Sequence, residues 1–133
     1  MNERRQVAPE PAHEMLERIF HEPSRLAIMS ALCASEAGLS FVELRTVCRL
    51  TDGNLNRHLR VLEEAEAVNV DKRFVKNKPL TTVRISEKGL QRFQEYLAAL
   101  TQVLDAARRS LPRESGAAKS RLTGVLPSMF AIR

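Results

Sequence analysis

The 133-residue sequence has no tryptophan and a single tyrosine. An aromatic cage or a base-stacking platform needs several large aromatic side chains, so neither is expected here. There are only two cysteines, Cys33 and Cys48, and they form no CxxC pair and no metal-ligand spacing. We therefore expect no disulfide framework, and we interpret both cysteines as small apolar core residues in a reducing cytosol.

Long apolar runs and catalytic motifs are also missing. No stretch approaches the roughly 20 residues of a membrane span, and the N-terminal MNERRQVAPEPAHE lacks the apolar segment of a signal peptide. There is no glycine-rich phosphate loop, GxSxG or HExxH motif, and His13, His21 and His58 show no metal-ligand spacing. The sequence therefore predicts a soluble cytoplasmic protein with no membrane partner, no cofactor and no enzymatic activity.

The composition is that of one globular domain. Hydrophobic residues make up 44% of the chain and charged residues 28%, which suffices for a core at this length. The net charge is +5, but much of the excess lies in residues 108–133, which hold six basic residues and one acidic residue. Because residues 51–85 are only mildly positive, the arrangement of basic residues matters more than their number.

We divide the chain into an N-terminal arm (1–12), a folded body (13–111) and a basic tail (112–133). The arm is polar and contains two prolines. The tail is rich in serine and glycine, so disorder is the simplest expectation. Alternatively, its apolar end LTGVLPSMFAI straps across a partner subunit.

Four helices are predicted before residue 66. The segment 13–20 places apolar side chains on one helical face, and a second helix begins at Pro23 and continues toward Gly38. Ser40 and Glu43 form a capping box for a short third helix. Thr51 is the N-cap of a fourth helix, which runs to about residue 65.

The rest of the body reads as a hairpin and a long helix. Strands at 68–75 and 80–85 flank the turn KNKP, with Asn77 at its tip. Ser86 caps a helix over 87–110, about 36 Å long. Its apolar residues recur at alternating spacings of three and four, an a/d seam typical of helix pairing: Leu90, Phe93, Leu97, Leu100, Leu104, Ala107 and Leu111.

We expect the seam from Leu90 to Leu97 to pack on its own domain and its C-terminal half to pack on a second subunit. The predicted fold is thus mainly α with a small β-hairpin wing. It is a winged helix-turn-helix with a long C-terminal dimerisation helix. Within this seam, the residues predicted at the dimer interface are Leu97, Leu100, Leu104, Ala107 and Leu111.

The fourth helix has an unusual first turn. In LTDGNLNRHL (50–59), Leu55 and Leu59 have the spacing of a buried helical face, but Asp52, Gly53 and Asn54 are poor helix formers. Small polar residues suit a helix that enters the DNA major groove with its N-terminus first. Two short helices, a tight turn at residues 49–50 and a basic hairpin together predict a winged helix-turn-helix.

This interpretation assigns DNA contacts to the helix and to the hairpin. Thr51 can bind a phosphate, Gly53 has no Cβ to hold the backbone away, and Asn54 and Arg57 can reach base edges. Three further residues of the helix are expected at the sugar-phosphate chain: Asn56, His58 and Arg60. The wing would lie along or in the minor groove with Lys76, Asn77 and Lys78 at its tip and Arg73 and Arg84 behind.

Three segments together resemble winged helix DNA-binding proteins close to the MarR and ArsR regulators: FHEPSRLAIMSAL, LTDGNLNRHLRVLEEA and FVKNKPLTTVRISEKGLQRFQEYLAAL. The resemblance covers about residues 18–105, and it is greatest to a compact single-domain subgroup with a T-D-G-N-L-x-x-H-L pattern. It implies a homodimeric transcriptional regulator with dimer contacts from the first and last helices. The implied contacts of the first helix are Leu16, Ile19 and Phe20. The implied DNA contacts are Thr51, Asp52, Asn54, Asn56, Arg57, His58, Arg60, Lys76 and Lys78.

The sequence departs from this family in two places. Glu66 stands where the family commonly has a glycine after the recognition helix, which puts the helix end and the hairpin angle in doubt. Asn77 replaces a glycine at the wing tip, although asparagine tolerates a left-handed conformation. The cysteine pair of ArsR-type metal sensors is absent from the third helix, which has only Cys48, so metal sensing is disfavoured.

Several alternatives remain open from the sequence. His58 can half-bury against Leu55 instead of contacting phosphate, and Asp52 is better explained by stabilising the helix start than by base readout. The function expected is sequence-specific binding of a homodimer to a palindromic operator in double-stranded DNA, with repression as the default mode. The rival functions are a protein–protein interaction module, and a regulator gated by an unidentified small-molecule effector or by cysteine oxidation.

Overall fold

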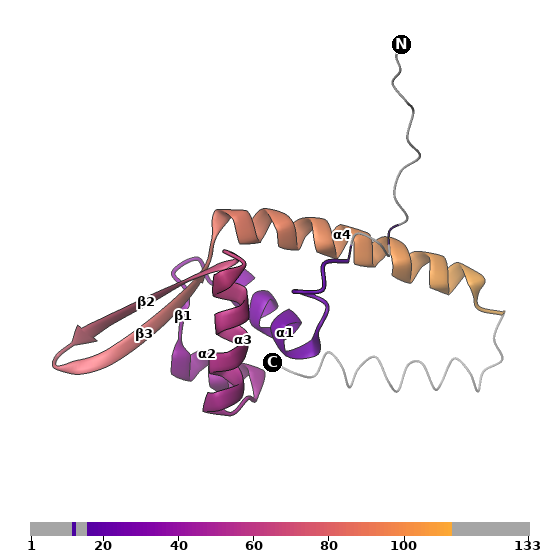
Figure 1. Cartoon of the computed structure of the whole chain (residues 1–133). Helices are drawn as coiled ribbons and strands as arrows, with labels where there is room; N and C mark the ends of the chain where they lie inside the picture. The colour runs from indigo at the N-terminus through magenta and orange to yellow at the C-terminus, as the bar shows by residue number, and fades with distance from the viewer. Residues whose placement is uncertain (1–11, 13–15, 113–133) are drawn as a thin grey trace, which may run out of the picture.

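The computed structural model describes residue 12 and residues 16–112 (Figure 1). These residues form α1 (Pro23–Cys33), β1 (Leu39–Ser40), α2 (Phe41–Cys48), α3 (Asp52–Glu64), β2 (Val68–Val75), β3 (Lys78–Ile85) and α4 (Glu87–Ser110). The predicted winged helix fold, mainly α with a hairpin wing and a long last helix, is confirmed. The predictions for the arm and the tail lie almost entirely outside the described residues.

The core lies where α1, α2 and α3 meet the base of the wing. Leu44 of α2 and Leu55 and Leu62 of α3 are fully buried, together with Ile28 of α1 and Val83 of β3. The spacing of seven between Leu55 and Leu62 places both on the same side of α3. The polar residues between them are therefore left on the outer side of the helix.

Short-range caps set the starts of the helices, as predicted. Ser40 Oγ accepts a hydrogen bond from the backbone N–H of Glu43, whose carboxylate in turn accepts one from the N–H of Ser40. The side chains of Thr51 and Ser86 accept hydrogen bonds from the backbone N–H groups of Asn54 and Gly89 at the starts of α3 and α4. Each cap satisfies a backbone donor that has no partner inside the helix.

The wing is an antiparallel hairpin within a three-stranded sheet of order β1-β3-β2. Lys76 and Asn77 form its two-residue turn with φ values of 53° and 64°, as the primed hairpin turns require. β3 therefore begins at Lys78, two residues earlier than predicted. β1 was not predicted, because two residues, Leu39 and Ser40, are too short to show an alternating pattern.

The helix predicted over 13–20 is absent from its described part. Residues 16–20 instead make one turn, in which the N–H groups of Phe20 and His21 both donate to the carbonyl of Glu17. Pro23 disfavours a helical conformation at Glu22, which is extended and caps α1. Because Glu22 is extended, the turn at residues 16–20 cannot continue into α1. One isolated helical turn is too short to be stable as a helix.

Phe20 anchors this turn in the core of its own subunit. Its ring lies 5.3 Å from that of Phe93 and 5.7 Å from that of Tyr96, and its side chain is fully buried. The prediction that Phe20 contacts a second subunit is therefore wrong for this structure. The spacing of apolar residues within 13–20 shows which of them share a helix face. It could not show that Phe20 packs on α4.

Gly89 lets the start of α4 approach the chain between α3 and β2. A Cβ at this position would lie 2.0 Å from the carbonyl oxygen of Ala67, so no larger residue fits without a backbone shift. Arg92, one turn later, donates to the carbonyl of Ala65 at 2.7 Å and forms an ion pair with Glu17. These contacts fix the direction in which α4 leaves the domain.

The apolar seam of α4 divides in a way that the sequence did not predict. Phe93 is buried and Leu100 is half-buried against the domain, but Leu90 and Leu97 are 38% and 39% exposed. The prediction that Leu90 packs on its own domain is therefore wrong. One row of leucines spaced seven apart is exposed along the helix: Leu90, Leu97, Leu104 and Leu111.

The C-terminal half of α4 extends beyond the body formed by α1, α2 and α3 (Figure 1). Leu104 lies on this half and Leu111 is the C-cap at its end, and they are 45% and 54% exposed. No helix in residues 16–112 is long and apolar enough to cross a membrane.

Candidate nucleic-acid interface

The first turn of α3 is built from small polar residues, and the fold itself does not require all of them. Thr51 Oγ1 accepts a hydrogen bond from the N–H of Asn54 at 3.1 Å. A Cβ built at Gly53 would meet no atom within 4 Å, so this glycine is not needed for packing within the subunit. Glycine in a helix is less favourable than alanine by about 1 kcal/mol. A close approach by another molecule would explain why glycine stands there.

Asp52 is held by an arginine of the preceding helix. Its Oδ1 lies 2.7 Å from Nη1 of Arg45, and the side chains of Asp52 and Arg45 are 64% and 37% exposed. The carboxylate also stands at the positive end of the α3 dipole. The structure therefore gives Asp52 a role in joining α2 to α3 and stabilising the helix start, as the sequence favoured over base readout.

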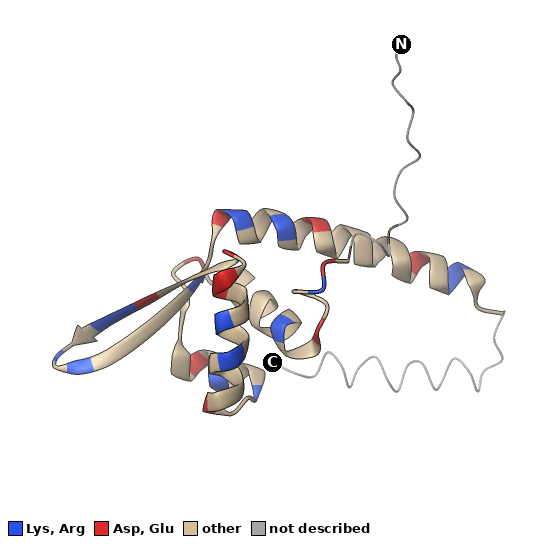
Figure 2. Cartoon of the chain, viewed as in Figure 1, with Lys and Arg blue, Asp and Glu red and all other residues tan. Residues whose placement is uncertain are grey.

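The outer face of α3 carries the predicted polar residues. Asn54, Asn56, Arg57 and Arg60 are exposed, whereas Leu55 and Leu62 are fully buried on the inner side of the helix. Arg57 donates a hydrogen bond from Nη2 to Oδ1 of Asn54 at 3.3 Å. Both side chains thus reach over the same patch of the helix, and Figure 2 shows the basic bands along α3 and the wing.

His58 does not lie on this face, so its prediction as a phosphate contact is corrected. Its side chain is 6% exposed and points toward the start of α1, where its Nδ1 is 3.2 Å from Nη1 of Arg25 and 3.8 Å from Oε1 of Glu22. Arginine is a donor only, so Nδ1 accepts and the ring is neutral with its proton on Nε2. Burial lowers the pKa of His58, and the positive charges of Arg25 and Arg57 lower it further against the opposing effect of Glu22.

The predicted basic residues of the wing lie at different distances from its tip. Lys76 and Asn77 form the tip and Lys78 begins the returning strand, all exposed. Arg73, behind the tip, donates from Nε to Oδ2 of Asp71 at 2.9 Å. Arg84 lies near the wing's base, beside Asn69 on the neighbouring strand, and its Cγ would lie 2.7 Å from a Cβ at Gly38.

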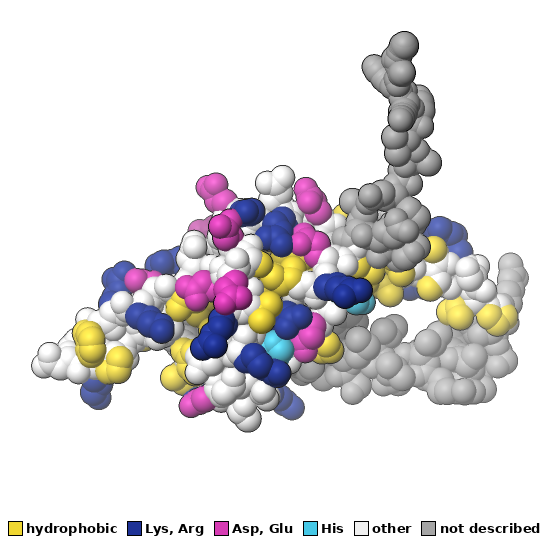
Figure 3. Space-filling model, viewed as in Figure 1, with side chains coloured by type: hydrophobic (Ala, Val, Ile, Leu, Met, Phe, Trp, Pro, Cys, Tyr) yellow, Lys and Arg dark blue, Asp and Glu magenta, His cyan; other side chains and the backbone are white. Residues whose placement is uncertain are grey.

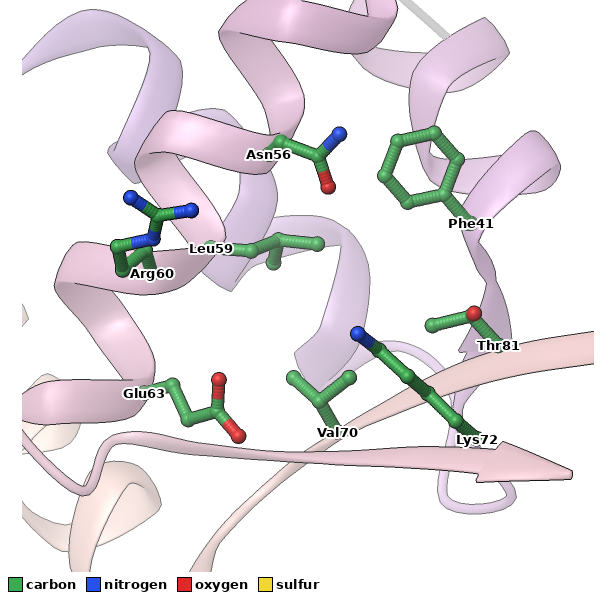
Figure 4. A pocket seen from close by; sticks show the side chains of 8 residues that line it. All are labelled: Phe41, Asn56, Leu59, Arg60, Glu63, Val70, Lys72 and Thr81. Carbon is green, nitrogen blue, oxygen red and sulfur yellow. The ribbon is translucent and has the colours of Figure 1, made fainter.

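An open cleft of about 340 Å³ separates α3 from the wing (Figure 4). Leu59 and Val70 form part of its apolar wall, and Arg60 and Lys72 bring cations from α3 and β2. Neither cation makes an ion pair with another described residue. The cleft is lined by Phe41, Asn56, Leu59, Arg60, Glu63, Val70, Lys72 and Thr81.

The sequence interpretation missed Lys72. The signal was present in the strand alternation, because Lys72 is two residues from Val70, which packs against the core, and so lies on the same side of the hairpin. Which side faces α3 depends on how the hairpin packs. Alternation within one strand cannot show this.

The two cysteines are less buried than predicted. Cys33 is exposed at the end of α1, so its assignment to the core is wrong, and Cys48 is half-buried against the core. Desolvation raises the pKa of both thiols, which disfavours the reactive thiolate. Among residues 16–112 no group of three histidine, cysteine or carboxylate side chains is placed to hold a metal ion.

The family model of the winged helix DNA-binding domain matches residues 24–104, a span that includes the helix-turn-helix, the wing and most of α4. The chain belongs to this winged helix family. As a member it is a DNA-binding regulator and not an enzyme, as predicted. An uncharacterized protein of Methanocaldococcus jannaschii is 34% identical over 86 residues, which cover 65% of this chain and 92% of the relative.

Solved structures show the same winged helix arrangement. A transcriptional regulator homologue from Pyrococcus horikoshii is 32% identical, with a TM-score of 0.65 over 71% of this chain and 94% of its own. A MarR-family regulator from Rhodococcus sp. is 12% identical, with a TM-score of 0.62 over 90% and 81% of the two chains. MepR of S. aureus, in a complex with DNA, is 15% identical with a TM-score of 0.59 over 90% and 89%.

Proposed function

We propose that this winged helix protein is a sequence-specific regulator that binds a palindromic operator as a homodimer and represses transcription by occupying the promoter. The observation that carries the proposal is the first turn of α3. It is capped, exposed and free of side-chain bulk at Gly53, which has open space around it. A helix start of this kind can lie against base edges in the major groove.

Residues of different chemistry support sequence reading and backbone binding. Asn54 and Arg57 extend over one patch, where an asparagine suits adenine and an arginine suits guanine. Asn56 and Arg60 point toward the cleft beside the wing, where the backbone would pass. Lys76 and Lys78 at the tip provide further cations for phosphate. MepR, which has a similar fold, forms a complex with DNA, and this supports the proposal.

The exposed leucine row of α4 supports the homodimer. Leu97, Leu104 and Leu111 are 39–54% exposed and seven residues apart, a spacing that keeps them on one side of a helix paired with another. Ala107 is also exposed on this helix. Leu16, Ile19 and Leu100 are partly buried in their own subunit, so they would contribute only the edge of such an interface.

A two-fold dimer would place its two α3 helices in successive major grooves, about 34–36 Å apart. The selection of binding sites from random duplex DNA by the purified chain tests this proposal. A palindromic enriched motif with half-sites about one helical turn apart is the expected result. Enrichment of a single half-site would overturn the dimer, and no enrichment would overturn sequence-specific binding.

The salt dependence of the affinity for DNA distinguishes DNA binding from the rival role as a protein-binding module. If the exposed face of α3 and the wing neutralise phosphates, DNA affinity falls steeply as salt is raised. The Arg57→Ala variant is the matched control for sequence reading, because it should relax base preference at one position. An affinity for duplex DNA that is independent of salt would argue for the protein-binding role.

A further inference from the structure

The outer end of the wing carries apolar side chains in an exposed position. Phe74 is 76% exposed, the largest exposed fraction of any large apolar residue in residues 16–112. Val75 and Leu80 nearby are 43% and 37% exposed. Figure 3 shows apolar side chains gathered at this end beside basic ones. Exposed apolar side chains gathered at one end of a molecule are a candidate contact with another molecule.

The strand register places Phe74 on one side of the hairpin and its two apolar neighbours on the other. Phe74 alternates with Val70 and Lys72, which line the cleft beside α3. Val75 pairs with Lys78, and Leu80 with Arg73, on the opposite side. Phe74 therefore lies on the same side of the wing as the proposed backbone-binding cleft.

The hairpin holds Phe74 in a defined position. Its cross-strand partner is Pro79, and the two-residue turn at Lys76–Asn77 closes the hairpin just beyond it. β1 pairs only with Thr82 and Val83, so this end of the wing has no third strand and stands clear of the domain. An aromatic side chain on such a support can enter a narrow groove with little loss of conformational freedom.

The surrounding charges match the minor groove of DNA. Lys72 lies on the same side of the wing as Phe74, and Lys76 forms the turn just beyond it, so one apolar residue has a cation before it and after it along the wing; Lys78 lies on the other side of the hairpin. The minor groove has phosphates along both rims and sugar and base edges between them. Proteins that bind there commonly combine basic residues with an inserted apolar side chain.

The spacing along β2 also fits. Two strand residues span about 7 Å, which is the distance from Lys72 to Phe74 along the wing. The minor groove is about 6 Å wide. A phosphate strand seated between Arg60 and Lys72 would therefore place Phe74 over the groove that lies next to it.

We propose that Phe74 enters the minor groove beside the α3 site and packs against the sugars and a base step there. The inference rests on the proposed DNA-binding function and names a contact within it. Phe74 would contribute apolar burial in the groove while the lysines around it bind phosphate. Because the groove is narrowest and most negative at A·T-rich sequence, this contact would favour A·T pairs flanking the major-groove site.

The absence of tryptophan provides a direct test. A Phe74→Trp variant has one indole, at the proposed contact, and a Val75→Trp variant has one on the opposite side of the wing. Each variant is titrated with an A·T-rich duplex of about 20 base pairs, and binding is followed independently by the anisotropy of a dye on the DNA. Quenching and a blue shift of the indole emission at position 74, with little change at position 75, are expected.

Affinity measurements on smaller side chains complete the test. Phe74→Ala should weaken binding by about ten- to hundred-fold, as expected for the loss of a buried aromatic side chain, while Phe74→Leu should retain most of the affinity. The salt dependence should be unchanged in both variants because no cation is lost. Val75→Ala is the matched control and should bind like the original chain.

The outcomes separate the two proposals. Saturable binding with no change in emission at position 74, or with equal changes at positions 74 and 75, would overturn the minor-groove contact and leave DNA binding intact. Wild-type affinity of Phe74→Ala would do the same. If the unmodified chain does not bind the duplex at low salt, the anisotropy shows it directly, and the proposed function fails together with this inference.

Discussion

Arg45 and Asp52 are joined across the turn of the helix-turn-helix, with 2.7 Å between Nη1 and Oδ1. The pair links the C-terminal half of α2 to the first residue of α3. It also explains how an acidic residue can stand at a surface proposed to meet phosphate. The carboxylate is partly neutralised by its partner, and the guanidinium of Arg45 is in turn held by the carboxylate.

The Asp52→Asn variant should bind duplex DNA more tightly than the original chain. The substitution removes a negative charge and frees Arg45, so nonspecific affinity rises and its dependence on salt becomes steeper. The cost in stability should be below about 1 kcal/mol, since the pair is exposed. Fluorescence anisotropy at several salt concentrations measures the change. Asp105→Asn, which removes the same charge on α4, is the control and should leave affinity unchanged.

The Gly53→Ala variant should be more stable and bind DNA less well. The new methyl group has open space around it and alanine is the better helix former, so stability rises by up to about 1 kcal/mol. The same methyl group would hold the α3 backbone away from DNA. Thermal unfolding and DNA titration on one preparation show whether the two effects have opposite sign.

Ser30→Ala, on the exposed side of α1, should stabilise the chain without weakening DNA binding. Unchanged DNA affinity in Gly53→Ala would place the helix start away from DNA.

Much of the fold was predictable because its signals are local. The caps at Ser40, Thr51 and Ser86 and the turn at Asn77 each depend on residues within a few positions of one another. The polar residues of α3 were found for the same reason, since Leu55 and Leu59 define the buried side within one helix.

The errors at the candidate site and along α4 concern contacts between distant segments. The inward position of His58 depends on Arg25 and Glu22 at the start of α1, and the buried position of Phe20 depends on Tyr96. Leu90 and Phe93 belong to one sequence seam, but only Phe93 meets the domain, because the close approach at Gly89 sets the rotation of α4. Periodicity shows which residues share a helix face. It does not show what that face meets.

Folding stability should decrease as pH falls below about 6.5, and His58 should be responsible. Its pKa is lowered in the folded state, so in this range the unfolded chain binds a proton that the folded chain resists. At higher pH both states are neutral at this position and the penalty is absent. The titration of the Glu22 carboxyl affects stability in a separate, more acidic pH range. Burial alone would raise its pKa, but hydrogen bonds from the backbone of Arg25 and Ser24 lower it overall.

Urea unfolding between pH 5 and pH 7.5 measures this dependence. His58→Gln should reduce the slope in the region from pH 5 to 6.5, even if its absolute stability is lower. The original chain, measured over the same pH range, is the reference. A slope that persists in His58→Gln would assign the proton uptake to another group.

The Glu66→Gly variant should raise the melting temperature by a few degrees. Glu66 has a φ of 64° after the C-cap of α3, and the N–H of Ala67 donates to the carbonyl of Leu62 at 2.9 Å, which completes a Schellman-type end. Glycine adopts this left-handed conformation without the Cβ clash of glutamate. The ion pair lost with Lys88 is exposed and contributes little to stability.

Glu64→Gly, within α3, is the control and should lower the melting temperature instead. A lower melting temperature in Glu66→Gly would show that the Lys88 pair outweighs the backbone strain.

Leu104→Glu should convert the proposed dimer to a monomer without unfolding it. Leu104 is 45% exposed on the part of α4 that extends beyond the domain, so a charge there costs the isolated subunit little. In the dimer the same charge would be buried against the partner's apolar row without a counter-ion, which strongly disfavours association. Sedimentation equilibrium measures the mass, and circular dichroism checks the fold. Gln102→Glu places the same charge elsewhere on α4 as the control.

Because a monomer can occupy only one half-site at a time, Leu104→Glu should also lose its preference for a palindrome over a single half-site. A dimer that persists in Leu104→Glu would show that subunit contact occurs elsewhere, and an original chain that sediments as a monomer would show that the leucine row does not pair.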